Sequence, residues 1–183
     1  MLLKDDNLTI RHATEDDALL LCQWWNDGNV MAHAGFPKGL GTTPEAVAES
    51  LAKDGDGTGR RLILEANSVP VGEMSYRSIA NGIAEIGIKI CDFTQQEKGF
   101  GTRFLRLLIA HLFSELGFDT IVLDTNVKNT RAQHVYEKLG FRRVQVRLDA
   151  WKDQLGELQS VIEYELTRES CLWTHTSRRG NSK

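Results

Sequence analysis

The sequence has little of what would place it among secreted or membrane-embedded proteins. Only three of its 183 residues are cysteine, and they lie far apart at Cys22, Cys91 and Cys171. This odd, scattered set favours thiols in a reducing compartment over a disulfide framework, which predicts a cytoplasmic protein. No apolar run approaches the roughly 20 residues that a membrane span needs, and the N-terminus turns acidic before a signal-peptide core could form.

A strong charge of one sign and a metal-binding spacing of histidines are also absent. The formal net charge is only −3, so no broad surface for nucleic acid or membrane is expected. The five histidines are scattered and show no metal-ligand spacing. What is present is ordinary, since 41% apolar residues can form a core and 183 residues fit one domain. We therefore expect a metal-free globular domain over residues 1–169, followed by a polar C-terminal tail over residues 170–183.

Hydrophobic periodicity predicts an α/β protein in which strands and helices alternate. A first strand is expected at residues 8–12, and two helices follow it, separated by a glycine-containing loop over residues 28–44. Three strands, a helix, a strand, a short helix and two closing strands then follow at residues 61–66, 69–78, 83–91, 99–116, 120–125, 129–139, 141–148 and 161–167. This order predicts a mixed, mostly antiparallel sheet of about seven strands with about four helices on its two faces.

The most informative segment is a glycine-containing loop between a predicted strand and the long helix after it. The loop consists of Gln96, Glu97, Lys98, Gly99, Phe100, Gly101 and Thr102. Two glycines let a ligand approach the backbone closely, and the free N–H groups at a helix N-terminus favour negative charge. The loop therefore predicts a diphosphate site. It has neither the third glycine of a Rossmann motif nor the Gly-Lys-Ser/Thr of a P-loop.

This loop resembles the first signature of the GNAT superfamily of N-acetyltransferases, Gln/Arg-x-x-Gly-x-Gly/Ala. A second segment resembles the superfamily's other signature and reads Asn129-x-x-Ala132-x-x-x-Tyr136-Glu137-Lys138-Leu139-Gly140-Phe141. It is most similar to the Rim-type branch, which acetylates protein N-termini, and to related small-amine acetylators. By element order the resemblance covers roughly residues 8–167. Phe93 is a departure, because many relatives have proline at that position.

The resemblance implies a cofactor, acetyl-CoA, whose acetyl group passes directly to a primary amine. It implies that the backbone of Lys89, Ile90 and Cys91 pairs with the pantetheine arm in a gap between two splayed strands. It also implies that the N–H groups of residues 96–102 hold the diphosphate. Asn129 would contact the pantetheine, although a helix N-cap role already explains its position.

Two side chains are candidates for the proton transfers. Tyr136 is the general acid that the resemblance implies, but it also shares an apolar helical stripe and could be a core residue. Glu85 aligns with the general base of the histone-acetylating members, and we expect a carboxylate walled by apolar neighbours that removes a proton through water. The alternatives are a solvated Glu85 with a water chain as the base, or Glu73 as a weaker candidate.

The acceptor is the least defined part of the interpretation. The resemblance places it against the first two helices and their loop, where Trp24, His33 and Phe36 are candidate lining residues. A protein N-terminus and a small amine, such as a polyamine, amino sugar or amino acid, are both open as acceptors. A non-catalytic acyl-CoA-binding domain is less favoured. Exposed sheet edges and apolar closing strands are compatible with a homodimer.

Overall fold

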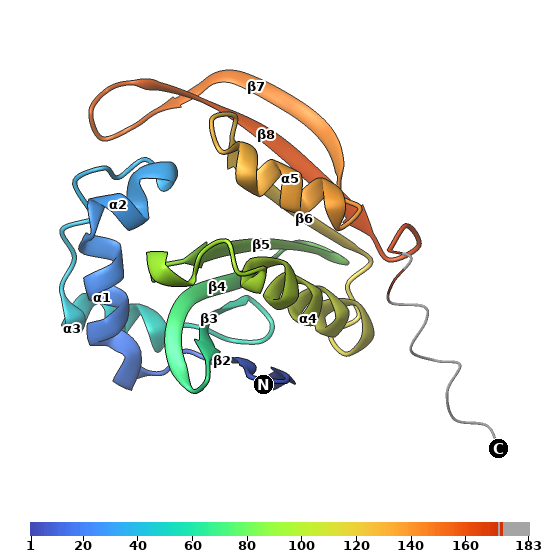
Figure 1. Cartoon of the computed structure of the whole chain (residues 1–183), viewed down its shortest axis with the longest axis horizontal. Coiled ribbons are helices and arrows are strands. Elements are labelled where there is room, and N and C mark those ends of the chain that lie inside the picture. Colours follow the sequence, from blue (N-terminus) through green and yellow to red (C-terminus); the bar gives the residue numbers. More distant parts are fainter. Residues whose placement is uncertain (172, 174–183) are drawn as a thin grey trace.

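The computed structural model describes residues 1–171 and 173. These residues form one eight-stranded sheet in the order β1-β2-β3-β4-β5-β6-β8-β7, shown in Figure 1. Neighbouring strands are antiparallel except for β5 and β6, which are parallel. The strands are β1 (Leu2–Asp5), β2 (Leu8–His12), β3 (Gly59–Ala66), β4 (Val69–Ala80), β5 (Ile83–Ile90), β6 (Thr120–Asn126), β7 (Arg142–Lys152) and β8 (Leu158–Thr167).

Helices cover both faces of the sheet. The larger core lies under α4 (Phe100–Ser114) and α5 (Thr130–Lys138), and it contains side chains such as Met74, Tyr76 and Phe104. A smaller cluster on the opposite face joins β3 to α1 (Ala18–Asn26) and α3 (Pro44–Leu51). The connection between α1 and α3 begins with a short α2 (Gly28–Met31) and a 3-10 turn, η2 (Ala32–Ala34). The expected mixed, mostly antiparallel sheet with helices on its two faces is confirmed.

The period of two along each strand assigns side chains to one face or the other. On β4, Met74 and Tyr76 enter the core under α4. The intervening Glu73, Ser75 and Arg77 therefore point to the opposite face. On that face each of them lies across from a residue of β5, and the three partners are Lys89, Gly87 and Glu85. The centre of the sheet thus has one apolar surface and one polar surface.

The parallel pair is very short. β5 pairs with β6 only from Ile83↔Thr120 to Glu85↔Val122, although both strands continue beyond that point. Residues 86–90 of β5 therefore have no partner on the β6 side, and the two strands diverge, as Figure 1 shows. The splayed strands that the resemblance implied are present at the expected place.

The sequence-based interpretation missed the strand β1 and the short elements α2 and η2. The strand β1 was not predicted, because Leu2-Leu3-Lys4-Asp5 has no alternation and its strand geometry comes from pairing with β2. The predicted loop over residues 28–44 contains α2 and η2, which the early glycine concealed. The sheet has eight strands where about seven were expected. None of the described helices combines the length and apolar character that crossing a membrane requires.

The C-terminal boundary also differs in detail from the expected tail at residues 170–183. Cys171 is fully buried, and Trp173 packs against the main core with its indole N–H donating to the Leu139 carbonyl at 3.2 Å. Residues 172 and 174–183, which make up most of the predicted tail, lie outside the described residues.

Candidate active site

The loop of residues 96–102 leads directly into α4 and has an open surface. Gly99 is the residue before the helix and has a φ of 77°, a conformation that favours glycine. A Cβ atom added at Gly99 or Gly101 would meet no heavy atom within 4 Å. The first N–H groups of α4 have no partner within the helix, because helix geometry leaves them free. The loop therefore fits an anionic diphosphate that approaches the backbone from outside.

The end of β5 beside this loop is less open than the resemblance implied. The Gln96 side chain donates to the Ile90 carbonyl at 3.1 Å, and the Cys91 N–H donates to the Val71 carbonyl at 2.9 Å. Two of the backbone groups expected to face a pantetheine arm therefore have partners within the chain. The Cys91 thiol is buried, and this burial together with the charge of Glu73 raises its pKa to about 12. Cys91 is thus a protonated, unreactive thiol at neutral pH.

Tyr136 lies on α5 at the apolar side of the splayed strands. Its ring meets Phe141 and Tyr164 at centroid distances of 5.9 and 5.7 Å. Burial, followed by the negative charge of Asp124, raises the pKa of Tyr136 to about 12, so the hydroxyl stays protonated at neutral pH. Among the described residues, only His12 has a polar side-chain atom that is sealed from solvent without a partner. The Tyr136 hydroxyl, which makes no hydrogen bond within the described residues, therefore retains contact with solvent.

Asn129 occupies the start of the same helix. Its side chain accepts a hydrogen bond from the Ala132 N–H at 3.2 Å, which is the N-cap interaction expected from its position. This bond uses the side-chain oxygen and leaves the amide group available to another partner. The cap explains why Asn129 is there and does not exclude a contact with the cofactor.

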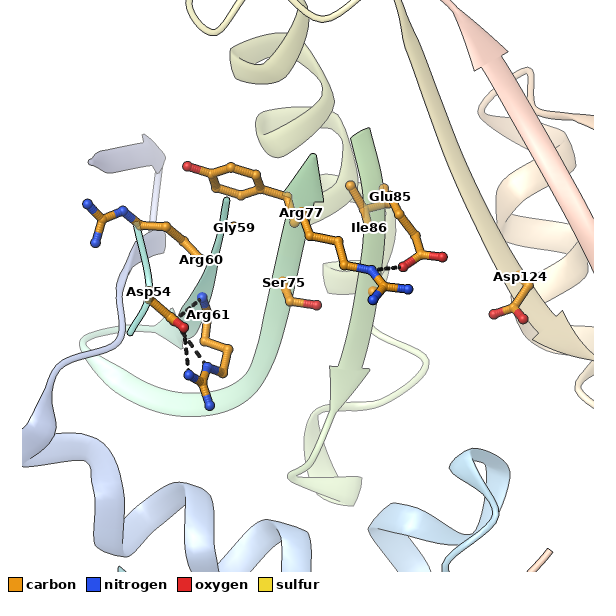
Figure 2. Close-up of a pocket in the computed structure, with 11 residues that line it drawn as sticks. Asp54, Gly59, Arg60, Arg61, Ser75, Arg77, Glu85, Ile86 and Asp124 are labelled. Atoms are coloured by element: carbon orange, nitrogen blue, oxygen red, sulfur yellow. Dashed lines mark hydrogen bonds and ion pairs between the residues drawn. The ribbon is translucent and has the colours of Figure 1, made fainter. Parts of the chain in front are cut away.

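A broad basin opens on the opposite face of the sheet, as Figure 2 shows. Its volume is about 510 Å³, and its lining comes from β3, β4, β5, β6 and the segment before β3. Ser75 and Gly87 lie side by side in this lining, and Gly87 adds no side chain. The basin therefore extends across the sheet toward the place where β5 and β6 separate.

Three carboxylates line the basin, and two of them are neutralised. Asp54 accepts two side-chain hydrogen bonds from Arg61, at 2.6 and 3.0 Å. Glu85 forms an ion pair with Arg77, visible as a dashed line in Figure 2. The expectation that Glu85 is walled by apolar neighbours is therefore wrong, because its neighbour across the strands is an exposed arginine. Glu85 lies on the polar face, where it faces solvent and a guanidinium.

Asp124 is the third carboxylate, and sequence reasoning missed it. It lies on β6 and makes no ion pair or hydrogen bond within the described residues, and Figure 2 draws it apart from the Arg77–Glu85 pair. Its side chain is exposed, but surrounding protein atoms displace part of its water, and this loss, followed by the charge of Glu85, raises its pKa. Alternation along β6 was the available signal, because Ile121 and Leu123 enter the core and Asp124 must face the other way.

Glu73 is held away from the open part of the basin. The carboxylate is buried, with the Trp25 indole N–H at 3.0 Å from each oxygen and the Lys89 ammonium at 2.8 Å from one. These bonds attach α1 to the centre of the sheet next to the splayed strands. Glu73 thus joins α1 to the sheet, a structural role that its sequence position did not reveal. Both of its carboxylate oxygens already accept hydrogen bonds within the protein.

The three predicted acceptor contacts lie in different surroundings. Trp24 is half-buried against the small core between α1 and α3. His33 is exposed on η2, and Phe36 is exposed in the loop that follows. None of the three lines the basin on the sheet. Their proposed contact with an acceptor stays a prediction. No group of three or more potential metal-binding side chains is found in the part of the chain that the structure describes.

Comparison with known proteins identifies the family. Residues 7–142 match the model of the acetyltransferase (GNAT) domain family. The aminoglycoside N(6')-acetyltransferase type 1 of Klebsiella pneumoniae is 26% identical over 152 residues, which cover 76% of each chain. Among solved structures, a spermidine N-acetyltransferase from Vibrio cholerae, in complex with CoA and spermine, has a TM-score of 0.82 and 23% identity, covering 92% of this chain and 99% of that one. The ribosomal-protein alpha-N-acetyltransferase RimL, in complex with coenzyme A, also has a TM-score of 0.82, with 18% identity, covering 93% of this chain and 99% of that one.

The family match agrees with the geometry, since an open glycine-containing loop leads into α4 and the strands β5 and β6 splay apart beside it. Together they identify an enzyme that uses acetyl-CoA to acetylate an amine, and the chain belongs to the GNAT acetyltransferase family.

Proposed function

We propose that this enzyme acetylates a primary amine on a small cationic molecule, such as a polyamine or an amino sugar, bound in the basin. The observation that carries the proposal is Asp124. Of the three carboxylates in the basin it alone lacks a partner within the described residues, since Asp54 is held by Arg61 and Glu85 by Arg77. A free carboxylate in a partly dehydrated site is the natural partner of an ammonium group.

The size of the basin supports a small acceptor. Its volume of about 510 Å³ lies within the range of about 300–1,000 Å³ that is typical of small-molecule sites. The curated aminoglycoside acetyltransferase and the spermidine acetyltransferase structure support the same class. A protein N-terminus is the second candidate, supported by the structural likeness to RimL. The charge distribution favours the first candidate, because Arg61 and Arg77 are each paired with a carboxylate of the basin, whereas Asp124 has no partner within the described residues.

The residues of this chain would divide the work as follows. Acetyl-CoA, when bound, supplies the acetyl group as a thioester that an amine can attack. Residues 96–102 would hold its diphosphate, and the end of β5 would lie along its pantetheine. An amine with a pKa of about 10.4 is protonated at neutral pH, so a carboxylate must help remove its proton. Asp124 and Glu85 would orient the ammonium and accept this proton through water, and Tyr136 would donate a proton to the departing sulfur.

The proposal is tested by a thiol-release assay with acetyl-CoA and three acceptors: spermidine, kanamycin and a short peptide with a free N-terminus. We expect turnover with at least one of the small amines. Asp124→Asn should raise its KM by roughly 10- to 100-fold, because the negative charge that strengthens the hydrogen bond to the ammonium group is lost, and should leave coenzyme A affinity unchanged. Asp149→Asn is the matched control, since Asp149 is an exposed aspartate on the outer strand β7. Turnover of the peptide alone, or equal KM values in the two variants, contradicts the proposal.

A further inference from the structure

The segment after α1 crosses the splayed strands on the basin side. Trp25, near the end of α1, is bonded to Glu73 on β4. The chain then turns through α2 and η2, and η2 lies against β6. Because β4 and β6 stand on opposite sides of the gap beside β5, residues 26–34 must pass over that gap. We call residues 28–39 the roof.

At three glycines of the roof, other atoms of the protein approach the backbone too closely for a side chain. A Cβ atom at Gly28 would stand 2.1 Å from the Pro37 carbonyl oxygen, and one at Gly39 would stand 2.2 Å from the Asn26 carbonyl oxygen. At Gly35 a Cβ atom would stand 2.4 Å from the ring of Trp151 on β7. The roof therefore folds back on itself and presses against the far hairpin of the sheet, with no room for even one methyl group.

Gln154, in the turn between β7 and β8, holds the far end of the roof by three hydrogen bonds. Its backbone N–H donates to the Gly35 carbonyl at 2.9 Å, and its side-chain oxygen accepts from the Lys38 N–H at 2.8 Å. Its side-chain amide donates to the Gly39 carbonyl at 3.0 Å. The oxygen and the nitrogen of the Gln154 side-chain amide thus both bond to the backbone of a segment 115 residues or more away in sequence.

The turn that carries Gln154 is organised without the roof. Asp153 accepts hydrogen bonds from the Leu155 and Glu157 N–H groups, at 2.8 and 3.0 Å, and from the Gln159 side chain at 2.8 Å. A backbone hydrogen bond from Gly156 to Asp153 closes the same turn. Gln154 is therefore presented in a fixed place, and the roof docks onto it.

We propose that Gln154 is a specificity-determining residue, which fixes the roof over the splayed strands and thereby sets an upper limit to the size of the acceptor at that end. The roof is tied to β4 at one end and to the β7–β8 turn at the other. An acceptor that lies along the basin toward the splayed strands would therefore meet a fixed roof at that end. A roof fixed in this way would admit the amine-bearing end of a molecule and exclude bulkier groups. The identity of the acceptor rests on the proposed function, whereas the docking of the roof is a property of the free chain.

The test compares Gln154→Ala with Gln145→Ala, an exposed glutamine on β7 that makes no side-chain hydrogen bond within the described residues. The first measurement is amide hydrogen exchange of residues 28–39 in the protein without ligand. We expect exchange to accelerate roughly ten-fold or more in Gln154→Ala, because two hydrogen bonds are removed, and to stay unchanged in the control. The second is the ratio of kcat/KM for kanamycin to that for spermidine, which should rise roughly ten-fold in Gln154→Ala alone.

The outcomes separate the two claims. Unchanged exchange in Gln154→Ala overturns the inference, and so does accelerated exchange with an unchanged ratio of kcat/KM. A wild-type protein that acetylates neither amine overturns the proposed function, whatever the exchange rates are.

Discussion

The two faces of the same two strands, β4 and β5, have opposite characters. On the side of α4, β4 and β5 present Met74, Tyr76 and Ile86 to a sealed apolar core. On the other side the same strands present an ion pair, a serine and a glycine to an open basin. The difference shows that stability and recognition are assigned residue by residue along one strand, because alternate side chains point to opposite faces.

The division between the two faces predicts that a change at the start of α4 can remove cofactor binding without disturbing the core. Gly101→Asp would place a carboxylate where the diphosphate is expected, and we expect acetyl-CoA affinity to fall at least about 100-fold through like-charge repulsion in a partly dehydrated site. Calorimetric titration measures the affinity. Gly57→Asp is the matched control, since a Cβ atom there also meets no heavy atom within 4 Å. Unchanged affinity in Gly101→Asp would place the cofactor elsewhere.

Tyr136 tests the division between a structural face and a functional face most directly. It is buried on the core side, yet it is a candidate for proton transfer. Tyr136→Phe should lower kcat by about 10²–10⁴-fold and leave acetyl-CoA binding intact, if its hydroxyl donates a proton. Tyr164→Phe, which removes a hydroxyl from the neighbouring ring, should retain turnover. Steady-state kinetics of both variants decide the matter. Wild-type kcat in Tyr136→Phe would assign the ring to packing, and the core face would then have no catalytic part.

Two substitutions on opposite faces of the sheet should change the free energy of unfolding in opposite directions. Phe104→Ala should reduce the free energy of unfolding by about 3–5 kcal/mol, since it empties a fully buried site. Asp124→Asn should instead increase it, by about a few tenths of a kcal/mol at pH 7, because folding raises the pKa of this carboxyl and so disfavours its charged form. The gain should vanish below pH of about 3.8, where both states are protonated. Urea unfolding at pH 7 and pH 3.5 measures it, and a destabilised Asp124→Asn would contradict the assignment.

Much of the sheet was predictable from the sequence because its strands have strong local signals. The alternation from Leu8 to His12 needed no tertiary information. The partner of Glu85 was not predictable, because the register that sets Arg77 opposite it is a property of two strands together. Asp124 was missed for a similar reason. Its significance depends on the neighbours of β6 in space, and no local pattern marks the place where a parallel pair ends.

The roof was the least predictable part of the site. Glycines at 28, 35 and 39 indicated a loop, yet each is there because another backbone or ring approaches too closely for a side chain. The bonding partner of that segment, Gln154, is a single polar residue in a distant turn. A pairing of this kind has no period and no motif, so only the folded chain reveals it.

The burial of all three cysteines has a practical use for assays of this enzyme. Cys22 and Cys91 are almost inaccessible and Cys171 is completely so, and the raised pKa of Cys91 keeps that sulfur in its unreactive form. A chromogenic disulfide reagent added to the folded protein would therefore report coenzyme A as it is liberated, against a background that stays flat until the polypeptide itself unfolds.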